Sequence, residues 1–295
     1  MANVNILYIK SLICQISQKI MELQILGSGG FLPIPRATCQ CRICKKARQK
    51  GGFYRRRGPA LYLNDVNVLI DTPEDINESL NFNEVNNVDT IIYTHWHPDH
   101  TLGYRVIETI CDQDFFKKKK TVKVYIPSYD WNNFKKFVPG LWYLESRGYA
   151  EIKKIPSKGV RVKGIHIKPI RLKNTTFSAF MITQQGKKTL LCPDHSMSLP
   201  MRDEYKNVSL LIINMGFFED NLKGLKKMPL NHRLRKSTGF EKDNLRIINE
   251  LKPKKTILMH IDEKFNRSND DLNILERKYK DLNIKFATDG LQIKI

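Results

Sequence analysis

Short apolar runs alternate with longer stretches of mixed polarity along most of the chain. Runs dominated by Leu, Ile, Val and aromatic residues, bounded by turn-forming residues, indicate strands buried in a sheet. The runs that indicate strands are residues 22–26, 60–63, 66–70, 90–94, 122–126, 160–172, 178–183, 189–192, 210–214, 256–259 and a final strand at 284–287. Asn64-Asp65 separates the second run from the third, which predicts a hairpin.

Helical spacing of apolar residues occurs between these strands. The predicted helices are residues 102–110, 131–147 with a break at Pro139-Gly140, 242–251 and 270–280. No linker or internal repeat divides the alternating pattern. We therefore predict one α/β domain over residues 21–295, with two sheets faced by helices.

Residues 1–20 are treated separately, because the first convincing strand begins directly after them. Their apolar part is interrupted by lysine and glutamine and lacks a small-residue cleavage site, so it does not indicate a secretory signal. They are either an extension of uncertain status or the product of an upstream start codon. No apolar run is long enough to span a membrane, and we expect a cytoplasmic protein.

The formal net charge of +20 favours an anionic partner, such as a phosphorylated substrate or nucleic acid. The lysines are nevertheless spread along the whole chain, as a compositional bias of the genome would also produce. The lysine run at 117–120 is interpreted as a solvated loop. The pattern does not distinguish a monomer from a homodimer.

Three of the six cysteines lie within six positions. Cys39, Cys41 and Cys44 form a C-x-C-x-x-C pattern, whereas the other three are scattered. In a chain without a secretory signal, clustered thiols more often hold a metal than form disulfides. The cluster therefore predicts a metal site, and the scattered cysteines are interpreted as core residues.

Four further candidate metal ligands lie together at the end of a predicted strand. The segment reads His95-Trp96-His97-Pro98-Asp99-His100. Imidazole and carboxylate groups bind zinc, manganese and iron. Residues two apart in an extended segment face the same way, so His95 and His97 can share one ion, while the turn after Pro98 directs Asp99 and His100 to a second. This pattern predicts a two-metal site.

Segment 95–100 resembles the H-x-H-x-D-H motif of the metallo-β-lactamase superfamily, which also follows a buried strand. The resemblance extends from residue 21 to the C-terminus and implies the αββα sandwich of that superfamily, with two mixed sheets faced by helices. It also implies three further roles. Asp71 would be the structural aspartate that orients the metal loop, Asp194 would bridge the two metal ions, and His260 would be the final ligand.

Within the superfamily, the chain is most similar to the phosphoribosyl cyclic phosphodiesterases and the pyrroloquinoline-quinone biosynthesis B proteins. This similarity rests on Leu-Gly-Ser-Gly-Gly at 26–30 and on the cysteine pattern at 39–44, which in those proteins is a structural zinc knuckle. It implies one structural zinc ion on the three cysteines. His232 falls where these phosphodiesterases place a substrate-facing histidine; without the resemblance it is an exposed loop residue.

Two positions depart from the pattern of these relatives. At the first metal site, the alignment places Asn174 where they have a third histidine, and asparagine is a feeble ligand for these metals. This predicts a first site that binds its ion more weakly than the second. His166, eight residues earlier, and His195, beside the bridging aspartate, are the alternative ligands.

The second departure concerns the cysteine cluster. In these relatives the fourth ligand of the knuckle is a histidine three residues after the last metal histidine, and this position holds Glu263. Glu263, Asp262 or a water molecule are the candidates to complete the zinc site.

The resemblance implies a metal-dependent hydrolase that cleaves a small cyclic or nucleotide-like phosphodiester with a metal-bound hydroxide. Two divalent ions of zinc, manganese or iron would lower the pKa of a bridging water and neutralise the departing group. Asp194 would bridge the ions and Asp99 would orient the hydroxide. His232 would protonate the leaving oxygen or bind the phosphate.

Two alternatives from other classes stay open. The charge favours a nuclease of the tRNA-processing type, although the sequence has no recognisable long arm to hold tRNA. The missing third histidine favours a degenerate, non-hydrolytic accessory or binding protein of the same fold. Two tightly held ions at the histidine site would argue for an enzyme.

Overall fold

A computed structural model describes residues 21–112, 120–216, 223, 228–232, 235, 239 and 241–295. The predicted N-terminal extension at 1–20 and most of the lysine run at 117–120 lie outside the described residues. Among the residues that are described, no helix is long and apolar enough to cross a membrane.

Fourteen strands are assigned in the described part of the chain. Their bounds are β1 (Glu22–Gly27), β2 (Ala60–Leu63), β3 (Val68–Ile70), β4 (Thr90–Ile92), β5 (Val122–Pro127), β6 (Ala150–Ile155), β7 (Val160–Val162), β8 (Ile165–Arg171), β9 (Ser178–Gln184), β10 (Lys187–Cys192), β11 (Leu210–Asn214), β12 (Thr256–Met259), β13 (Ile284–Phe286) and β14 (Gln292–Lys294).

The helices between these strands are mostly short. Their bounds are α2 (Arg42–Lys50), α3 (Ile76–Phe82), α4 (Pro98–Thr101), α5 (Val106–Cys111), α6 (Trp131–Phe137), α7 (Gly140–Ser146), α9 (Glu241–Leu251) and α10 (Asn269–Lys278). Short 3₁₀ segments join several of them, including η2 (Asn64–Val66), η3 (Leu102–Arg105), η4 (Ser196–Ser198) and η7 (Glu263–Phe265).

The strands form two mixed seven-stranded sheets. The first has the order β14-β1-β2-β3-β4-β5-β6 and the second has the order β13-β12-β11-β10-β9-β8-β7. Strands β3 to β6 are parallel to one another, and so are β10 to β13, whereas the remaining neighbours are antiparallel. Within each sheet the parallel strands therefore present their carboxyl ends at one edge, where ligands bind in sheets of this kind.

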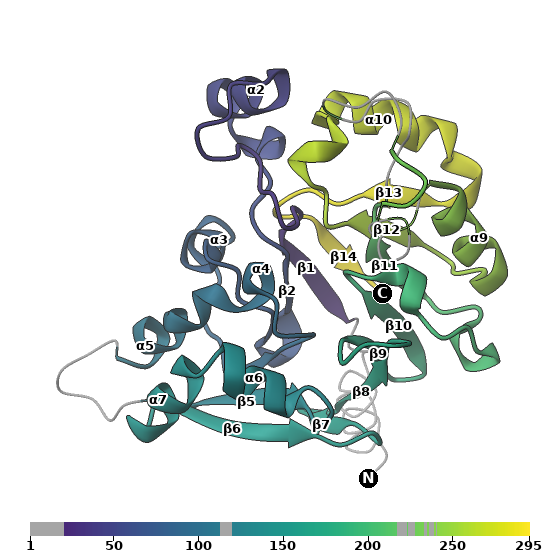
Figure 1. The fold of residues 1–295 in the computed structure, drawn as a ribbon. Helices are drawn as coiled ribbons and strands as arrows, with labels where there is room; N and C mark the ends of the chain where they lie inside the picture. The colour runs from purple at the N-terminus through teal and green to yellow at the C-terminus, as the bar shows by residue number, and fades with distance from the viewer. Residues whose placement is uncertain are drawn as a thin grey trace, which may run out of the picture.

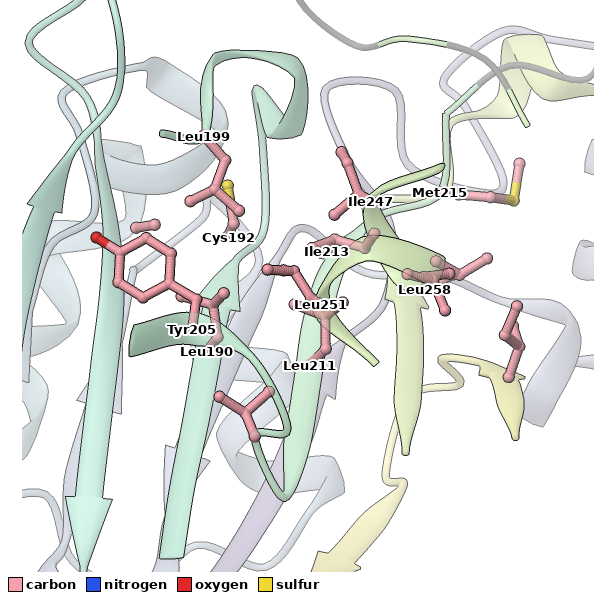
Figure 2. Packing of buried hydrophobic residues seen from close by; sticks show 14 of the residues in the cluster. Leu190, Cys192, Leu199, Tyr205, Leu211, Ile213, Met215, Ile247, Leu251 and Leu258 are labelled. Carbon is pink, nitrogen blue, oxygen red and sulfur yellow. The ribbon is translucent and has the colours of Figure 1, made fainter. Parts of the chain in front are cut away.

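Three apolar layers hold the two sheets and the helices together. The middle layer joins inward-facing side chains of both sheets, such as Ile25 of β1 and Ile212 of β11. The first sheet packs its other face on α3, α5, α6 and α7. The second sheet packs its outer face on α9 and α10, and Figure 2 shows part of this core, with Leu251 beside Leu211 and Ile213.

The arrangement of layers is helix, sheet, sheet, helix, as Figure 1 shows. This confirms the αββα sandwich expected from the resemblance. Helix α2 stands at the top of Figure 1 beside α10, away from the other helices of the N-terminal half. Ion pairs join the two helices, including Arg42 to Asp271 at 3.0 Å.

Most predicted strands are present, and three predicted elements need correction. The predicted helix at 102–110 is η3 followed by α5, and Gly103 at the start packs so closely on the carbonyl of Pro73 that no side chain would fit. The predicted strand at 160–172 is the hairpin of β7 and β8, because Lys163 and Gly164 form a turn with positive φ.

The third correction concerns the end of the chain. The strand predicted at 284–287 is β13 of the second sheet, but it is not the final one. Strand β14 follows and pairs with β1 at the edge of the first sheet. Its alternation of exposed and buried residues spans three positions only, which is too short to stand out in the sequence.

Candidate metal centre

The loop after β4 carries four candidate ligands at the carboxyl end of a buried parallel strand. His95, Asp99 and His100 are buried and His97 is half-buried. Pro98 occupies the first position of the short helix α4, where its missing N–H removes no hydrogen bond. The helix turns the chain at this point, so that His95 and His97 face one group of ligands while Asp99 and His100 face another.

Asp71 fixes the orientation of this loop from a fully buried position. Its Oδ2 accepts hydrogen bonds from the Thr94 hydroxyl at 2.7 Å and lies 2.8 Å from Nδ1 of His100. The Thr94 hydroxyl also lies 3.0 Å from Nδ1 of His95. Because hydrogen bonds hold the Nδ1 atoms of His95 and His100, their Nε2 atoms face the centre. A carboxylate behind a metal-binding histidine orients the imidazole in this way.

We name two groups of ligand atoms by their members. The first group contains His95, His97, Asp194 and His195. The second group contains Asp99, His100 and His260. Within each group the ligand atoms all lie within 4.8 Å of one another. The two groups adjoin, because the rings of His95 and His100 are 4.1 Å apart between centroids.

The spacing within the groups matches the donor set of a metal ion. Oδ2 of Asp99 lies 3.5 Å from Nε2 of His100 and 3.3 Å from Nε2 of His260. Oδ2 of Asp194 lies 3.2 Å from Nε2 of His195. Ligands held tetrahedrally around zinc at its usual bond lengths are separated from one another by roughly 3.3–3.6 Å.

Unsatisfied nitrogen atoms give a second, independent indication. The Nε2 atoms of His95, His100 and His260 are buried and have no hydrogen-bond partner among the described residues. Buried polar atoms are almost always paired, and binding of an ion is one of the standard explanations of an exception. The residues present therefore fit two divalent ions.

The electrostatics of the site also favour cations. Burial opposes ionisation of Asp99, yet the imidazoles of His100 and His260 outweigh it and hold the pKa of Asp99 well below its usual range. Burial likewise acts against a charged His260, but Asp194 and Asp99 raise its pKa to about 10. The carboxylates thus stay ionised and attract positive charge to this centre.

His260 enters the second group from the loop after β12. Its backbone has a positive φ of 58°, and Gly30, from the loop after β1, packs directly against its ring. A Cβ atom at position 30 would overlap the imidazole. The Gly-Ser-Gly-Gly segment is therefore needed partly for close packing on this ligand, a role that the sequence signal alone did not reveal.

The alternatives for the missing third histidine have different positions. Asn174 is an exposed residue in the turn between β8 and β9, with a φ of 58°. His166 lies within β8, and its Nε2 is 2.9 Å from the carbonyl oxygen of Lys158. His195 belongs to the first group, directly after Asp194.

His232 lies in a turn that begins at Pro229. Its N–H donates to the carbonyl oxygen of Pro229 at 3.1 Å, and its side chain is half-buried. Its contact with a substrate stays a prediction.

A second candidate metal site joins the cysteines to the loop after His260. We call Cys39, Cys41, Cys44 and Glu263 the cysteine cluster, since their ligand atoms all lie within 4.8 Å of one another. Oε1 of Glu263 lies 2.9 Å from Sγ of Cys41 and 3.5 Å from Sγ of Cys39. Cys44 lies inside helix α2, so the three sulfurs come from a loop and a helical turn and not from a loop alone.

Cationic side chains surround this cluster. The ammonium group of Lys223 contacts Glu263 and lies 3.1 Å from Sγ of Cys39, and Arg36 lies 3.7 Å from Glu263. The pKa of Cys39 falls to about 7, first because its sulfur accepts the backbone N–H of Cys41 and also because of Lys223. Asp262, the other predicted candidate, instead accepts the N–H of Leu32 at 2.7 Å.

Phe177 is a residue of the centre that sequence reasoning missed. Its ring centroid lies 4.5 Å from that of His95, 4.6 Å from that of His97 and 4.7 Å from that of His195. A single phenylalanine before a strand carries no sequence signal for such a position, because its importance follows only from the packing of two loops.

The fold and the two ligand groups define a class of protein, one with the metallo-β-lactamase fold and a candidate metal centre. The family model for the beta-lactamase superfamily domain matches residues 66–261, about two thirds of the chain. The chain therefore belongs to the β-lactamase superfamily, in its metallo-β-lactamase branch.

Solved structures of similar fold cover nearly the whole chain. A diphosphatase from the PhnP family is 20% identical, with a TM-score of 0.69, covering 94% of this chain and 97% of that one. Zn²⁺-bound PqqB from Methylobacterium extorquens is 14% identical, with a TM-score of 0.64, covering 93% and 100%. The short form of human tRNase Z is 16% identical, with a TM-score of 0.62, covering 92% and 98%.

A curated protein matches a shorter stretch. An octanoyltransferase from Porphyromonas gingivalis is 31% identical over 93 residues, which is 31% of this chain and 18% of that protein. The match spans less than a fifth of that relative's length.

Proposed function

We propose that this protein is a two-metal phosphodiesterase that hydrolyses a small cyclic or nucleotide-like phosphodiester. The observation that carries the proposal is the pair of adjoining ligand groups with their unsatisfied Nε2 atoms. Two ions held side by side are the arrangement used for in-line displacement at phosphorus. Similar folds that include a diphosphatase and a tRNase Z support a phosphate ester as the substrate.

The two groups divide the ligands between the ions. The first group would hold one ion and the second group the other, and Asp194, a member of the first group whose charge also acts on His260, is the carboxylate that would serve both. When bound, the two ions lower the pKa of a water molecule and neutralise negative charge on the phosphate. Zinc, manganese and iron all suit this mixture of imidazole and carboxylate.

The side chains of this chain supply the remaining parts of the reaction. The Asp99 carboxylate, which is ionised, can accept a hydrogen bond from the attacking water and orient it. Asp71 keeps the imidazoles in the correct orientation. His232 would bind the phosphate or donate a proton to the leaving oxygen.

The cysteine cluster serves a separate purpose in this proposal. It would hold one structural zinc ion through three sulfurs and Glu263. Three thiolates and a carboxylate carry more negative charge than zinc neutralises, and Lys223 and Arg36 would compensate the excess.

Hydrolysis of bis-p-nitrophenyl phosphate by the metal-depleted and the reconstituted protein tests the proposal. We expect activity only after zinc, manganese or iron is restored, and little activity toward p-nitrophenyl acetate. Asp99→Asn and His260→Ala should abolish turnover while circular dichroism shows a folded protein. His166→Ala is the matched control, because its imidazole bonds a surface turn and should retain full activity.

The outcome also separates the alternatives. A reconstituted wild-type protein that holds two ions but cleaves no phosphodiester would contradict the proposed activity and favour a non-hydrolytic accessory protein. Cleavage of tRNA precursors without cleavage of small diesters would favour the nuclease.

A further inference from the structure

In the pattern of the similar phosphodiesterases the first metal site has a third imidazole, and position 174 does not provide one. Asn174 lies in an exposed turn, and its amide is a weak ligand. This leaves His95, His97 and Asp194 as the ligands expected from the family pattern. The additional imidazole in the first group belongs to His195.

We propose that His195 is the third histidine of the first metal site, so that this ligand has moved from the turn before β9 to the loop after β10. This deepens the proposed function, because it completes the site that the function needs. The Nε2 atom of His195 lies 3.2 Å from Oδ2 of Asp194, close to the ligand separation of roughly 3.3–3.6 Å around zinc. Its ring centroid lies 6.1 Å from that of His95 and 5.8 Å from that of His97.

The backbone at His195 is held in a conformation that directs the side chain to this point. Its φ of 55° and ψ of 35° place it in the left-handed region, which residues with a Cβ atom adopt infrequently. The N–H of His195 donates to Oδ1 of Asp194 at 2.7 Å, and its carbonyl accepts from Ser198 at 2.9 Å. Strained backbone of this kind persists where the surroundings determine it, most often at functional sites.

The next residue anchors the loop to the neighbouring strand. The N–H of Ser196 donates to Oδ1 of Asn214, at the end of β11, at a distance of 2.8 Å, and Ser196 is buried. The loop after β10 is therefore attached to a rigid parallel strand, which is how a ligand is held in a productive position.

Phe177 explains why the ligand comes from this side. Its ring packs against His95, His97 and His195 at once, with centroid distances of 4.5 to 4.7 Å. The turn from Asn174 to Phe177 thus contributes an apolar ring to the first group and no imidazole. The imidazole comes from the neighbouring loop after β10, which is joined to this turn by the hydrogen bond from the N–H of Lys173 to the carbonyl oxygen of Ser198 at 2.8 Å.

Metal analysis and cobalt spectroscopy test this assignment without relying on activity. Wild-type protein should bind two ions at the two groups in a chelator-competition titration. His195→Ala should keep the ion of the second group and lose affinity at the first by more than the roughly 10–100-fold that loss of an outer partner causes. The visible absorption of the cobalt-substituted protein should change accordingly.

His195→Cys keeps the test decisive if removal of the side chain harms folding. A thiolate at this position should restore binding and raise the near-ultraviolet sulfur-to-cobalt charge-transfer absorption above the level that the cysteine cluster gives in the wild type. Asn174→Ala and His166→Ala are the controls and should bind both ions with wild-type affinity.

Three results would overturn the assignment. The first is that His195→Ala binds two ions with unchanged affinity, and the second is that His195→Cys shows no charge-transfer absorption beyond that of the wild type. The third is a wild type with one ion or none at the two groups. If the wild type binds two ions and His195→Ala loses one of them, the assignment is supported even when no diester is hydrolysed. In that case only the proposed function fails.

Discussion

At position 30 a candidate metal ligand leaves no room for a side chain, and the residue there is Gly30. It packs against the imidazole of His260, and a Cβ atom there would overlap the ring. We expect Gly30→Ala to displace this imidazole and to weaken metal binding at the second group by at least about tenfold, which corresponds to about 1.4 kcal/mol. Chelator competition measures the affinity.

Gly186→Ala provides the control for Gly30→Ala. Gly186, in the turn between β9 and β10, has a φ of 78°, and the Cβ atom of an alanine there would have no neighbour within 4 Å. This variant should lose about 1 kcal/mol of folding stability and keep its metal affinity. Equal metal affinity in both variants would show that contact with the His260 ring is unimportant.

Asp71 acts on the metal ligands through hydrogen bonds. Replacement of Asp71 by Asn puts an amide group opposite Nδ1 of His100 and removes one acceptor for the Thr94 hydroxyl. We expect a loss of roughly 10–100-fold in metal affinity, the range typical of such partners. Thermal unfolding of the metal-free variant distinguishes this effect from a loss of fold, and unchanged affinity would contradict the role of Asp71.

Residues close in sequence were the predictable part of this site. His95, His97, Asp99 and His100 follow from spacing within one loop, because the strand that precedes them fixes their directions. His195 was one of three alternatives, since its selection depends on a left-handed backbone and on Phe177. Contacts of that kind join loops far apart in the chain and leave no local pattern.

Helix α2 has a small apolar contact surface, so the cysteine cluster should contribute to holding it in place. Only Ile34, Ile43 and Ala47 form a buried apolar cluster there. We expect replacement of Cys39, Cys41 and Cys44 by serine to remove one zinc ion per chain and to increase proteolysis within residues 39–54. Mass spectrometry of metal content and limited digestion measure the two effects.

Two further variants complete the test of the cysteine cluster. Cys111→Ser changes a buried cysteine on α5, outside the cluster, and should keep the full zinc content. Glu263→Gln should weaken zinc binding, because a neutral amide replaces the carboxylate near Cys41. Zinc content that is unaffected by the triple replacement would refute the structural zinc site.

Elements with strong periodicity were predictable, and short ones were not. Strands such as β11, with four consecutive buried apolar residues before Asn214, stand out in the sequence. Lysine and arginine make up most of helix α2, and only three buried positions carry its helical pattern. Strand β14 is recognised only through its pairing with β1, which joins the two ends of the described chain.

The charge of the whole molecule should influence the capture of its substrate. With a formal net charge of +20, the protein attracts anions over a distance that salt shortens. We expect kcat/KM for bis-p-nitrophenyl phosphate to decrease severalfold between 10 and 200 mM salt, while hydrolysis of a neutral ester, if any, does not change. Independence from salt would show that the charge plays no part.

The salt dependence of RNA binding addresses the nuclease alternative. A gel-shift affinity that falls steeply with salt would indicate many phosphate contacts.

Sequence alone predicted the fold of the whole molecule well, because the alternation of strands and helices is a property of the entire chain. It could not identify a nucleic-acid surface, since lysines spread evenly along a sequence do not show which face they share.

The loop after β12 carries a ligand of each kind of site within four residues. His260 belongs to the second group and Glu263 to the cysteine cluster, while Asp262 between them holds the N–H of Leu32 in the segment that leads to the cysteines. Binding at one site restricts the same backbone that the other must order, so the two affinities should be thermodynamically linked. Linkage is reciprocal: if an ion on the cysteine cluster changes the affinity of the second group for its own ion by some factor, the ion of the second group must change the affinity of the cysteine cluster by the same factor.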